Sequence, residues 1–413
     1  MLYGRISRSV VRRRHRLLVN NFTEEGVNPQ IRSSRRLRVL HCITRLGLGG
    51  AERVAFAIMR ELRKEVDFAV FTVHAASRDE IGAELQGELT VTQTPWFIGT
   101  RVQMRHGGML PGGIALAHAV RSWKPDIVHY HSETPEACGA VMTCIPGFGQ
   151  HRTIRTIHNS IFWRYWPRIG RWCDRQLAAA TIVGVSEAAL VEFLRYRRDS
   201  GVPPATEEPA VIYNGVSLPL LPPRTGPRLP HLRRVLFAGR FEDQKGTDVI
   251  CRALPLVRLP AGTTGELTFV GDGAHRSVVT ELMVRAPRGW TVDVRRPVAG
   301  LAPVFSEFDL LVMPSRFEGL GLVAIEATFS GLPVVTTDAP GLREVFPSDY
   351  PWRAIPGDEN SLAAVLTVAL EATSLWAATV RTVQDFGQTR FSPSAMGKGY
   401  LRTYQAIGMQ LAT

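Results

Sequence analysis

Short apolar runs rich in β-branched residues alternate with longer stretches that place apolar residues at helical spacing. The run at 38–44 is followed by glycines and a helical pattern at 51–62, and the alternation then recurs. Such a pattern indicates a parallel sheet covered by helices on both faces. The strands predicted for this part of the chain are residues 38–44, 68–73, 126–131, 153–157 and 181–185.

Eight prolines interrupt this pattern between residues 199 and 230, leaving one short apolar run at 210–213. Proline lacks an N–H donor, so this stretch is neither a continuous helix nor a central strand. The alternation restarts beyond it, and a helical pattern at 393–409 closes the chain. Strands are predicted at 234–239, 266–270, 310–313 and 333–337, and helices at 246–257 and 322–329.

These patterns predict an α/β protein with two doubly wound, Rossmann-like domains. In such sheets, ligands bind at the carboxyl ends of the strands. We place a basic extension at 1–36, a first domain at 37–215 (the first half), a second at 216–390 (the second half) and a closing helix at 391–413.

The net charge of +12 is high, and only four of the 49 basic residues are lysines. Arginines gather in the extension, which is either a frayed terminus or a contact with anionic lipid. Aromatic residues make up 8% and do not interleave with the basic run, so no stacking platform for nucleic acid is expected. The clustered arginines are Arg12, Arg13, Arg14, Arg35 and Arg36.

Five scattered cysteines without a CxxC pair predict neither a disulfide framework nor a zinc site. No apolar run reaches the ~18 residues that a membrane-spanning helix needs. The sequence therefore favours a cytoplasmic protein, with any membrane contact peripheral, at the inner face.

The first candidate site is a glycine-rich loop between a predicted strand and a helix, with Gly49 and Gly50 at the helix start. Backbone amides and the helix dipole favour an anion there. A dinucleotide fingerprint would need glycine at position 52, where Glu52 stands. A tight strand–helix turn is the alternative.

Three histidines follow neighbouring strands, and alternation puts His129 and His131 on one face, with His158 on the next strand. They are either cleft residues that contact a sugar or phosphate, or structural histidines. A metal site is disfavoured because no carboxylate recurs at ligand spacing.

Arg240 ends a strand and Lys245 precedes the next helix, so two cations and a helix start converge. This combination suits a diphosphate. Glu318 and Glu326 lie eight residues apart around the start of another helix, and carboxylates accept hydrogen bonds from vicinal hydroxyls. Between the two carboxylates, Gly319, Leu320, Gly321 and Leu322 expose backbone amides.

The ordered set of these motifs resembles glycosyltransferase family 4, which has the GT-B fold. The resemblance spans roughly 38–341 and is strongest around Glu318, Glu326 and the Gly331–Val335 segment. It implies a retaining enzyme that moves a sugar from a nucleoside-diphosphate sugar of UDP or GDP type to a hydroxyl acceptor. No metal or other cofactor is expected. It also implies a closing helix that crosses back to the first domain.

The resemblance implies roles for the candidate residues. Arg240 and Lys245 would bind the diphosphate, with Gly49 and Gly50 completing that site. Glu326 would bind the ribose and Glu318 the donor sugar. The amides of Gly319, Leu320, Gly321 and Leu322 would contact sugar and phosphates. His131 would contact the transferring sugar, with His158 as a second candidate.

The acceptor is expected to be a saccharide or a lipid-linked glycan in cell-surface polysaccharide or glycolipid synthesis. A nucleotide-sugar epimerase of the same fold and a non-catalytic homologue are alternatives, and a Rossmann oxidoreductase is disfavoured. Six aromatic residues in two loops, 94–111 and 160–172, form either an acceptor wall or ordinary packing: Trp96, Phe97, Phe162, Trp163, Tyr165 and Trp166.

Overall fold

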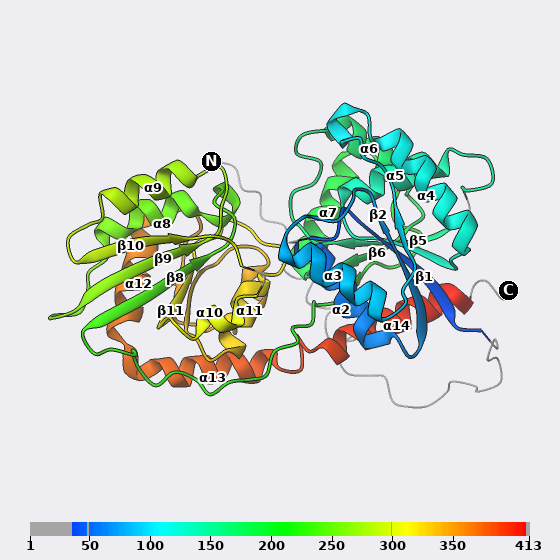
Figure 1. The fold of residues 1–413 in the computed structure, drawn as a ribbon. Helices are drawn as coiled ribbons and strands as arrows, with labels where there is room; N and C mark the ends of the chain where they lie inside the picture. The colour runs from blue at the N-terminus through cyan, green and yellow to red at the C-terminus, as the bar shows by residue number, and fades with distance from the viewer. Residues whose placement is uncertain (1–34, 48, 150, 299, 410–413) are drawn as a thin grey trace. The chain divides into compact units, whose positions relative to one another are not determined.

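The computed structural model describes residues 35–47, 49–149, 151–298 and 300–409, and residues 37–413 form one compact unit. The arginines expected at positions 12–14 lie outside the described residues. The first half contains a seven-stranded parallel sheet in the order β3-β2-β1-β4-β5-β6-β7 (Figure 1). Its strands are β1 (Leu37–Ile43), β2 (Val66–Thr72), β3 (Trp96–Ile98), β4 (Ile127–Tyr130), β5 (Arg152–Ile157), β6 (Thr181–Gly184) and β7 (Ala210–Val211).

Alternation along β1 divides the core of the first half between the two faces of its sheet. Val39 and Ile43 pack into one buried cluster, whereas Leu40 and Cys42 pack into the other. Both faces must therefore be covered, and helices on each side do this. The helices of this half are α2 (Gly50–Leu62), α3 (Glu80–Val91), α4 (Met109–Trp123), α5 (Glu133–Thr143), α6 (Pro167–Gln176) and α7 (Glu187–Asp199).

The second half repeats the design with a six-stranded parallel sheet in the order β10-β9-β8-β11-β12-β13. Its strands are β8 (Leu232–Ala238), β9 (Thr264–Val270), β10 (Trp290–Arg295), β11 (Leu310–Met313), β12 (Val334–Thr337) and β13 (Arg353–Ala354). Its helices are α8 (Thr247–Ala253), α9 (Arg276–Val284), α10 (Ala302–Phe305), α11 (Leu322–Phe329), α12 (Glu359–Glu371) and α13 (Trp376–Gly387).

The last helix, α14 (Pro393–Met409), packs on α2, β1 and β4 of the first half (Figure 1). Tyr400 and Tyr404 are fully buried in that contact. Gly397 permits the close approach, because a Cβ there would lie 2.3 Å from Cγ of Glu61 in α2. The predicted return of the closing helix to the first domain is therefore confirmed.

Sequence patterning missed four strands, β3, β7, β10 and β13, and placed the end of one helix too late. For β7 it noted only the short apolar run at 210–213. The helix predicted at 246–257 ends at Ala253 and continues only as a 3₁₀ turn, Leu254–Leu256. Pro255 has no N–H to donate along the helix, so the α-helix stops before it.

Within the described residues, no single helix is long and apolar enough to cross a membrane. One pair of segments, 359–371 and 373–387, meets that length and composition together, although it is bent by 77°.

A buried arginine joins β5 to two helices. Arg155 places one guanidinium nitrogen 2.7 Å from Glu136 Oε2 in α5 and another 2.6 Å from Asp174 Oδ1 in α6. The arginine and aspartate side chains are fully buried, and the glutamate nearly so. Removing one partner of such a group leaves uncompensated buried charge.

We expect Arg155→Met to lower the free energy of unfolding by about 3–5 kcal/mol, because two carboxylates lose their counter-charge. Urea unfolding followed by fluorescence measures the change. Arg195→Ala, which removes an arginine with 66% side-chain exposure, is the matched control and should shift stability by less than about 0.5 kcal/mol. Equal midpoints for the two variants would contradict the assignment.

Candidate active site

The loops after the strands of both sheets meet around a cleft of about 920 Å³. Glycine loops, histidines, cations and glutamates that lie far apart in the sequence all reach this one cavity. His129, the other histidine considered, does not line it. The residues to which the resemblance assigned a role all do: Gly49, Gly50, His131, His158, Arg240, Lys245, Glu318, Gly319, Leu320, Gly321, Leu322 and Glu326.

Lys245 and Glu318 form an ion pair in the lining of the cleft. The lysine Nζ lies 2.7 Å from Oε1 and 2.9 Å from Oε2 of the glutamate. Ser315 also donates its hydroxyl to Oε1 at 2.7 Å. The side chains are only 19% and 6% exposed, so each charge offsets the desolvation of the other.

Glycines with positive φ precede both helices that face the cleft from the second half. Gly246 (φ +66°) precedes α8, and Gly321 (φ +84°) precedes α11. A Cβ on Gly246 would lie 2.0 Å from the carbonyl oxygen of Pro314, so the left-handed turn and the contact both require glycine.

Arg240 lies at the rim of the cleft, with its side chain 65% exposed. Its guanidinium is 2.8 Å from Glu242 and 3.3 Å from the side-chain oxygen of Gln244. These exposed contacts are weak, so the guanidinium is available to an incoming anion.

Glu326 contacts a cation that the sequence analysis missed. Arg53 Nη1 in α2 lies 3.3 Å from Glu326 Oε1 in α11. Burial raises the pKa of Glu326, and the nearby Arg53 opposes that shift. Arg53 follows the glycine-rich loop directly, and its position at the start of α2 was the only available signal.

The glycine-rich loop places a carboxyl group where an anion was expected. Gly49 is the N-cap of α2, and a Cβ there would lie 1.9 Å from Oε2 of Glu52. Burial is the main cause that raises the pKa of Glu52. The helix start is thus already faced by this side chain, and an incoming phosphate would have to displace it.

The predicted histidines do lie together, and a fourth joins them. His129 and His131 share one face, with ring centroids 4.1 Å apart, and His131 Nδ1 is 3.2 Å from His158 Nε2. His41 of β1, which pairs in register with His129, lies 2.7 Å from His131. A polar residue inside the buried run 39–43 was the signal for it.

The loop that carries Glu318 lies directly against the first half. A Cβ on Gly319 would lie 2.0 Å from the carbonyl oxygen of His158. Ser160 donates its hydroxyl to the Glu318 carbonyl at 3.0 Å, and Ser186 donates to the Gly319 carbonyl. The backbone beside the Lys245–Glu318 ion pair is therefore held by groups from the loop after β5 and from the start of α7.

Residues 48–219 match the family model described as Glycosyltransferase Family 4, and residues 233–372 match the one described as Glycosyl transferases group 1. Together the two matches span most of the chain and include every residue to which the resemblance assigned a role, from Gly49 to Glu326. The chain belongs to the family 4 glycosyltransferases.

Related sequences agree with this assignment. A glycogen synthase of Mycobacterium tuberculosis is 30% identical over 270 residues, which is 61% of this glycosyltransferase and 61% of the relative. The D-inositol 3-phosphate glycosyltransferase of Jonesia denitrificans is 35% identical over 150 residues, covering 34% and 35% of the two chains. The chain thus matches less than two thirds of the length of these relatives.

Solved structures confirm the predicted GT-B fold. Anabaena HepE in complex with UDP-glucose superimposes with a TM-score of 0.71 at 18% identity, over 90% of this chain and all of that one. The two facing Rossmann-like sheets of this glycosyltransferase are therefore those of the GT-B class.

The aromatic residues predicted as an acceptor wall divide into two groups. Trp96 and Phe97 form strand β3 rather than part of a loop, and both pack against the core. The prediction of an acceptor wall is therefore wrong for these two residues, and the packing alternative is correct. The sequence placed these residues in a loop, whereas they form a short edge strand whose side chains pack against the core. Phe162, Trp163 and Tyr165 do line the cleft, whereas Trp166 does not and is exposed.

Two groups of side chains in the described residues have spacing suited to a metal ion. One is His41, His129 and His131, and the other is Asp243, Asp248 and His275. Asp248 is already paired with Arg316 at 2.7 Å through each carboxylate oxygen. The buried histidine nitrogens are engaged with one another and with hydroxyl groups. Neither group fits an open metal site.

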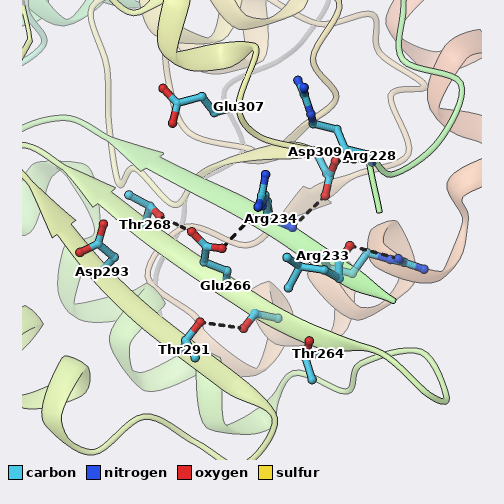
Figure 2. Close-up of polar contacts among 12 residues, drawn as sticks. Arg228, Arg233, Arg234, Thr264, Glu266, Thr268, Thr291, Asp293, Glu307 and Asp309 are labelled. Carbon is cyan, nitrogen blue, oxygen red and sulfur yellow. Dashed lines mark hydrogen bonds and ion pairs between the residues drawn. The ribbon is translucent and has the colours of Figure 1, made fainter. Parts of the chain in front are cut away.

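A smaller hollow of about 220 Å³ lies in the second half of this glycosyltransferase. Its lining holds two ion pairs: Arg234 lies 3.6 Å from Glu266 (Figure 2), and Arg295 lies 2.6 Å from Glu307. Close to them, Asp309 accepts the backbone N–H groups of Arg228 and Arg234 at 2.8 and 2.9 Å. These contacts hold the segment that leads into β8. They have a structural role and need no functional explanation.

Glu133, at the cleft wall, accepts the backbone N–H of Trp163. Burial raises the pKa of Glu133 from 4.5 to about 7. Between these two pH values the folded protein holds a proton that the unfolded chain has released. The free energy of unfolding therefore falls as pH rises through this window.

Glu133→Gln removes the titrating carboxyl, so we expect its free energy of unfolding not to fall in this window. Between pH 4.5 and 8 the variant should gain about 1–3 kcal/mol of stability relative to wild type. Urea unfolding at both pH values measures the difference. Glu192→Gln, at a carboxyl whose side chain is 40% exposed, serves as control and should follow wild type. Parallel profiles for Glu133→Gln and wild type would show that the carboxyl is ionised normally.

Proposed function

We propose that the protein transfers a sugar from a nucleoside-diphosphate sugar to a hydroxyl acceptor, with retention of anomeric configuration. The observation that carries this is the Lys245–Glu318 pair, at 2.7 and 2.9 Å, in a cleft that also holds Arg240, Arg53 and Glu326. Three cations and two carboxylates suit a diphosphate flanked by hydroxyl-bearing rings. A UDP-type donor is favoured, because HepE, with the same fold, was crystallised with UDP-glucose.

Donor binding would exchange partners within this cleft. The ammonium of Lys245 turns from Glu318 to the diphosphate, which frees the carboxylate to accept hydroxyl groups of the sugar. Glu326 likewise accepts the ribose hydroxyls while Arg53 meets the phosphates. Because each of these charges starts with a partner, neither Glu318 nor Glu326 is an uncompensated buried ion before the donor binds.

Departure of the nucleoside diphosphate builds negative charge on its terminal phosphate. Lys245 and Arg240, with the amides at residues 319–322, would stabilise that charge as it develops. The acceptor hydroxyl attacks on the face that the diphosphate leaves, and a phosphate oxygen takes its proton. These cations perform the task that a divalent metal has in other transferases, so the reaction should proceed with EDTA present.

We expect Lys245→Ala to weaken binding of the correct nucleoside diphosphate about tenfold or more, because one charged hydrogen bond contributes ~1.5–3 kcal/mol. Calorimetric titration with UDP, GDP, ADP and NAD in the presence of EDTA measures this. Lys64→Ala, an exposed lysine after α2, is the control and should bind as wild type. Binding of NAD alone would overturn the proposal.

Turnover separates the transferase from its two same-fold alternatives. A transferase releases nucleoside diphosphate in proportion to glycosylated acceptor. An epimerase alters the donor sugar without acceptor and without net nucleotide release, whereas a non-catalytic homologue binds the donor and does neither.

We further propose that the acceptor is saccharide or lipid-linked, displayed at the cytoplasmic face of an anionic membrane. Exposed apolar residues stand beside arginines on α4, on α6 and in the segments before them, and α5 packs between these helices. Such a mixture suits a membrane interface. The apolar residues are Val102, Leu110, Ile114, Tyr165 and Trp166, and the exposed arginines are Arg101, Arg105, Arg164 and Arg168.

We expect the double variant Leu110→Glu/Ile114→Glu to lose most co-sedimentation with vesicles that contain anionic lipid, since it adds two like charges to the contact. The exposed pair Val278→Glu/Val284→Glu on α9 is the control for adding the same charge elsewhere. Absence of wild-type binding to anionic vesicles at low salt would reject this location.

A further inference from the structure

Four histidines and one tyrosine form a hydrogen-bonded series that the proposed transfer chemistry leaves unexplained. His158 Nε2 lies 3.2 Å from His131 Nδ1, and His131 Nε2 lies 2.7 Å from His41 Nδ1. The hydroxyl of Tyr404 lies 3.5 Å from His41 Nε2 and 2.9 Å from His129 Nδ1. The series runs from the cleft wall to the buried face of α14.

These imidazoles are neutral. His41, His129 and His131 are fully buried, and burial lowers the pKa of His41 and of His158 to about 3 and those of the other two well below their usual value. No carboxylate hydrogen-bonds any of the four within the described residues. A neutral imidazole has one N–H and one lone pair, so every ring-to-ring contact joins a donor to an acceptor.

This rule couples the proton positions. If His131 donates from Nε2 to His41, then its Nδ1 must accept from His158, and His41 must carry its proton on Nε2. The opposite choice puts the proton on Nδ1 of all three. The Tyr404 hydroxyl has a single proton, so it donates to one of His41 and His129 and accepts from the other. The tautomer of His41 thus determines the tautomer of His129. The four histidines therefore share one tautomer.

The unpaired Nδ1 of His158 decides between the alternatives. With the proton on Nδ1, this half-buried ring would carry an N–H that has no acceptor among the described residues, whereas with the proton on Nε2 it carries only a lone pair there. An unpaired N–H is the rarer of the two in folded proteins, so the Nε2 form is favoured. In that form the Tyr404 hydroxyl donates to His129 Nδ1 at 2.9 Å. His129 then carries its proton on Nε2 and donates to Thr156 Oγ1 at 2.7 Å. His41 donates weakly to Tyr404 from Nε2.

We propose that all four histidines are protonated on Nε2, so that His158 presents an Nδ1 lone pair to the cleft. His41 and Tyr404 act as positioning residues that hold this tautomer. Among the described residues, no hydrogen bond is made to Nδ1 of His158. The group that fits it is a hydroxyl of a bound sugar or ribose. This last point rests on the proposed function, whereas the tautomer does not.

Nitrogen NMR of the full chain labelled with ¹⁵N-histidine tests the tautomer without substrate. Long-range ¹⁵N–¹H correlation at pH 7 reports which ring nitrogen bears the proton. Signals are assigned by loss in single His→Gln variants, or by contacts between rings where a variant does not fold. The expected result is four neutral rings, each with a lone pair on Nδ1 and a proton on Nε2.

Tyr404→Phe removes the hydroxyl and keeps the ring. The His158 Nδ1 resonance should then move from its lone-pair position toward an average of the two forms. Tyr350→Phe is the matched control, because it removes another buried tyrosine hydroxyl, which donates to Val334, and should leave all four rings unchanged.

Several results would overturn the inference. Mixed tautomers among the four rings would show that they are not coupled, and a shared Nδ1 proton would reverse the direction. If the His158 resonances did not change in Tyr404→Phe, then Tyr404 of α14 would have no role in holding the tautomer. A stoichiometric metal ion in the purified protein, with metal-shifted signals from His41, His129 and His131, would replace the proton series by a metal site.

Discussion

Parallel strands all end at the same edge of their sheet, and the rest of this molecule depends on that constraint. Each strand of both sheets delivers its following loop to that edge, and a helix must then return the chain outside the sheet. Residues from positions 49 to 326 thereby reach one cleft of about 920 Å³. The candidate residues lie together because parallel strands bring the loops that follow them to the same edge of each sheet.

Charge balance determines which ion pairs the residues of the cleft form with one another before a donor binds. Lys245 is held by Glu318, and Arg53 contacts Glu326, although the donor would need all of these groups. An unpaired ion in this half-buried setting would be costly, so donor binding, as proposed, is an exchange of partners rather than an addition. The affinity for the donor is accordingly a difference between two sets of contacts. Removing one member of a pair alters both terms, which is why matched controls matter in the binding experiment.

The sequence predicted most strands and the residues of the cleft because its signals there are local: β-branched runs, glycines at helix starts, and cations or carboxylates beside them. It failed where the signal lies in another part of the chain. Edge strand β3 has three residues, and its aromatic side chains resembled a binding loop although they pack inward. His41 and Arg53 acquire their partners only when β1 meets β4 and when α2 meets α11. No spacing along the chain encodes those encounters.

The packing of α14 on the first sheet has a consequence for synthesis on the ribosome. Tyr400 and Tyr404 fill the same cluster as residues of β1 and α2, yet they are translated more than three hundred residues later. At about 5–20 residues per second, the first half waits on the order of ten seconds or more with that cluster incomplete. Throughout this interval the part of that cluster which α14 covers is open to water, and a nascent chain in that state is a natural client for chaperones.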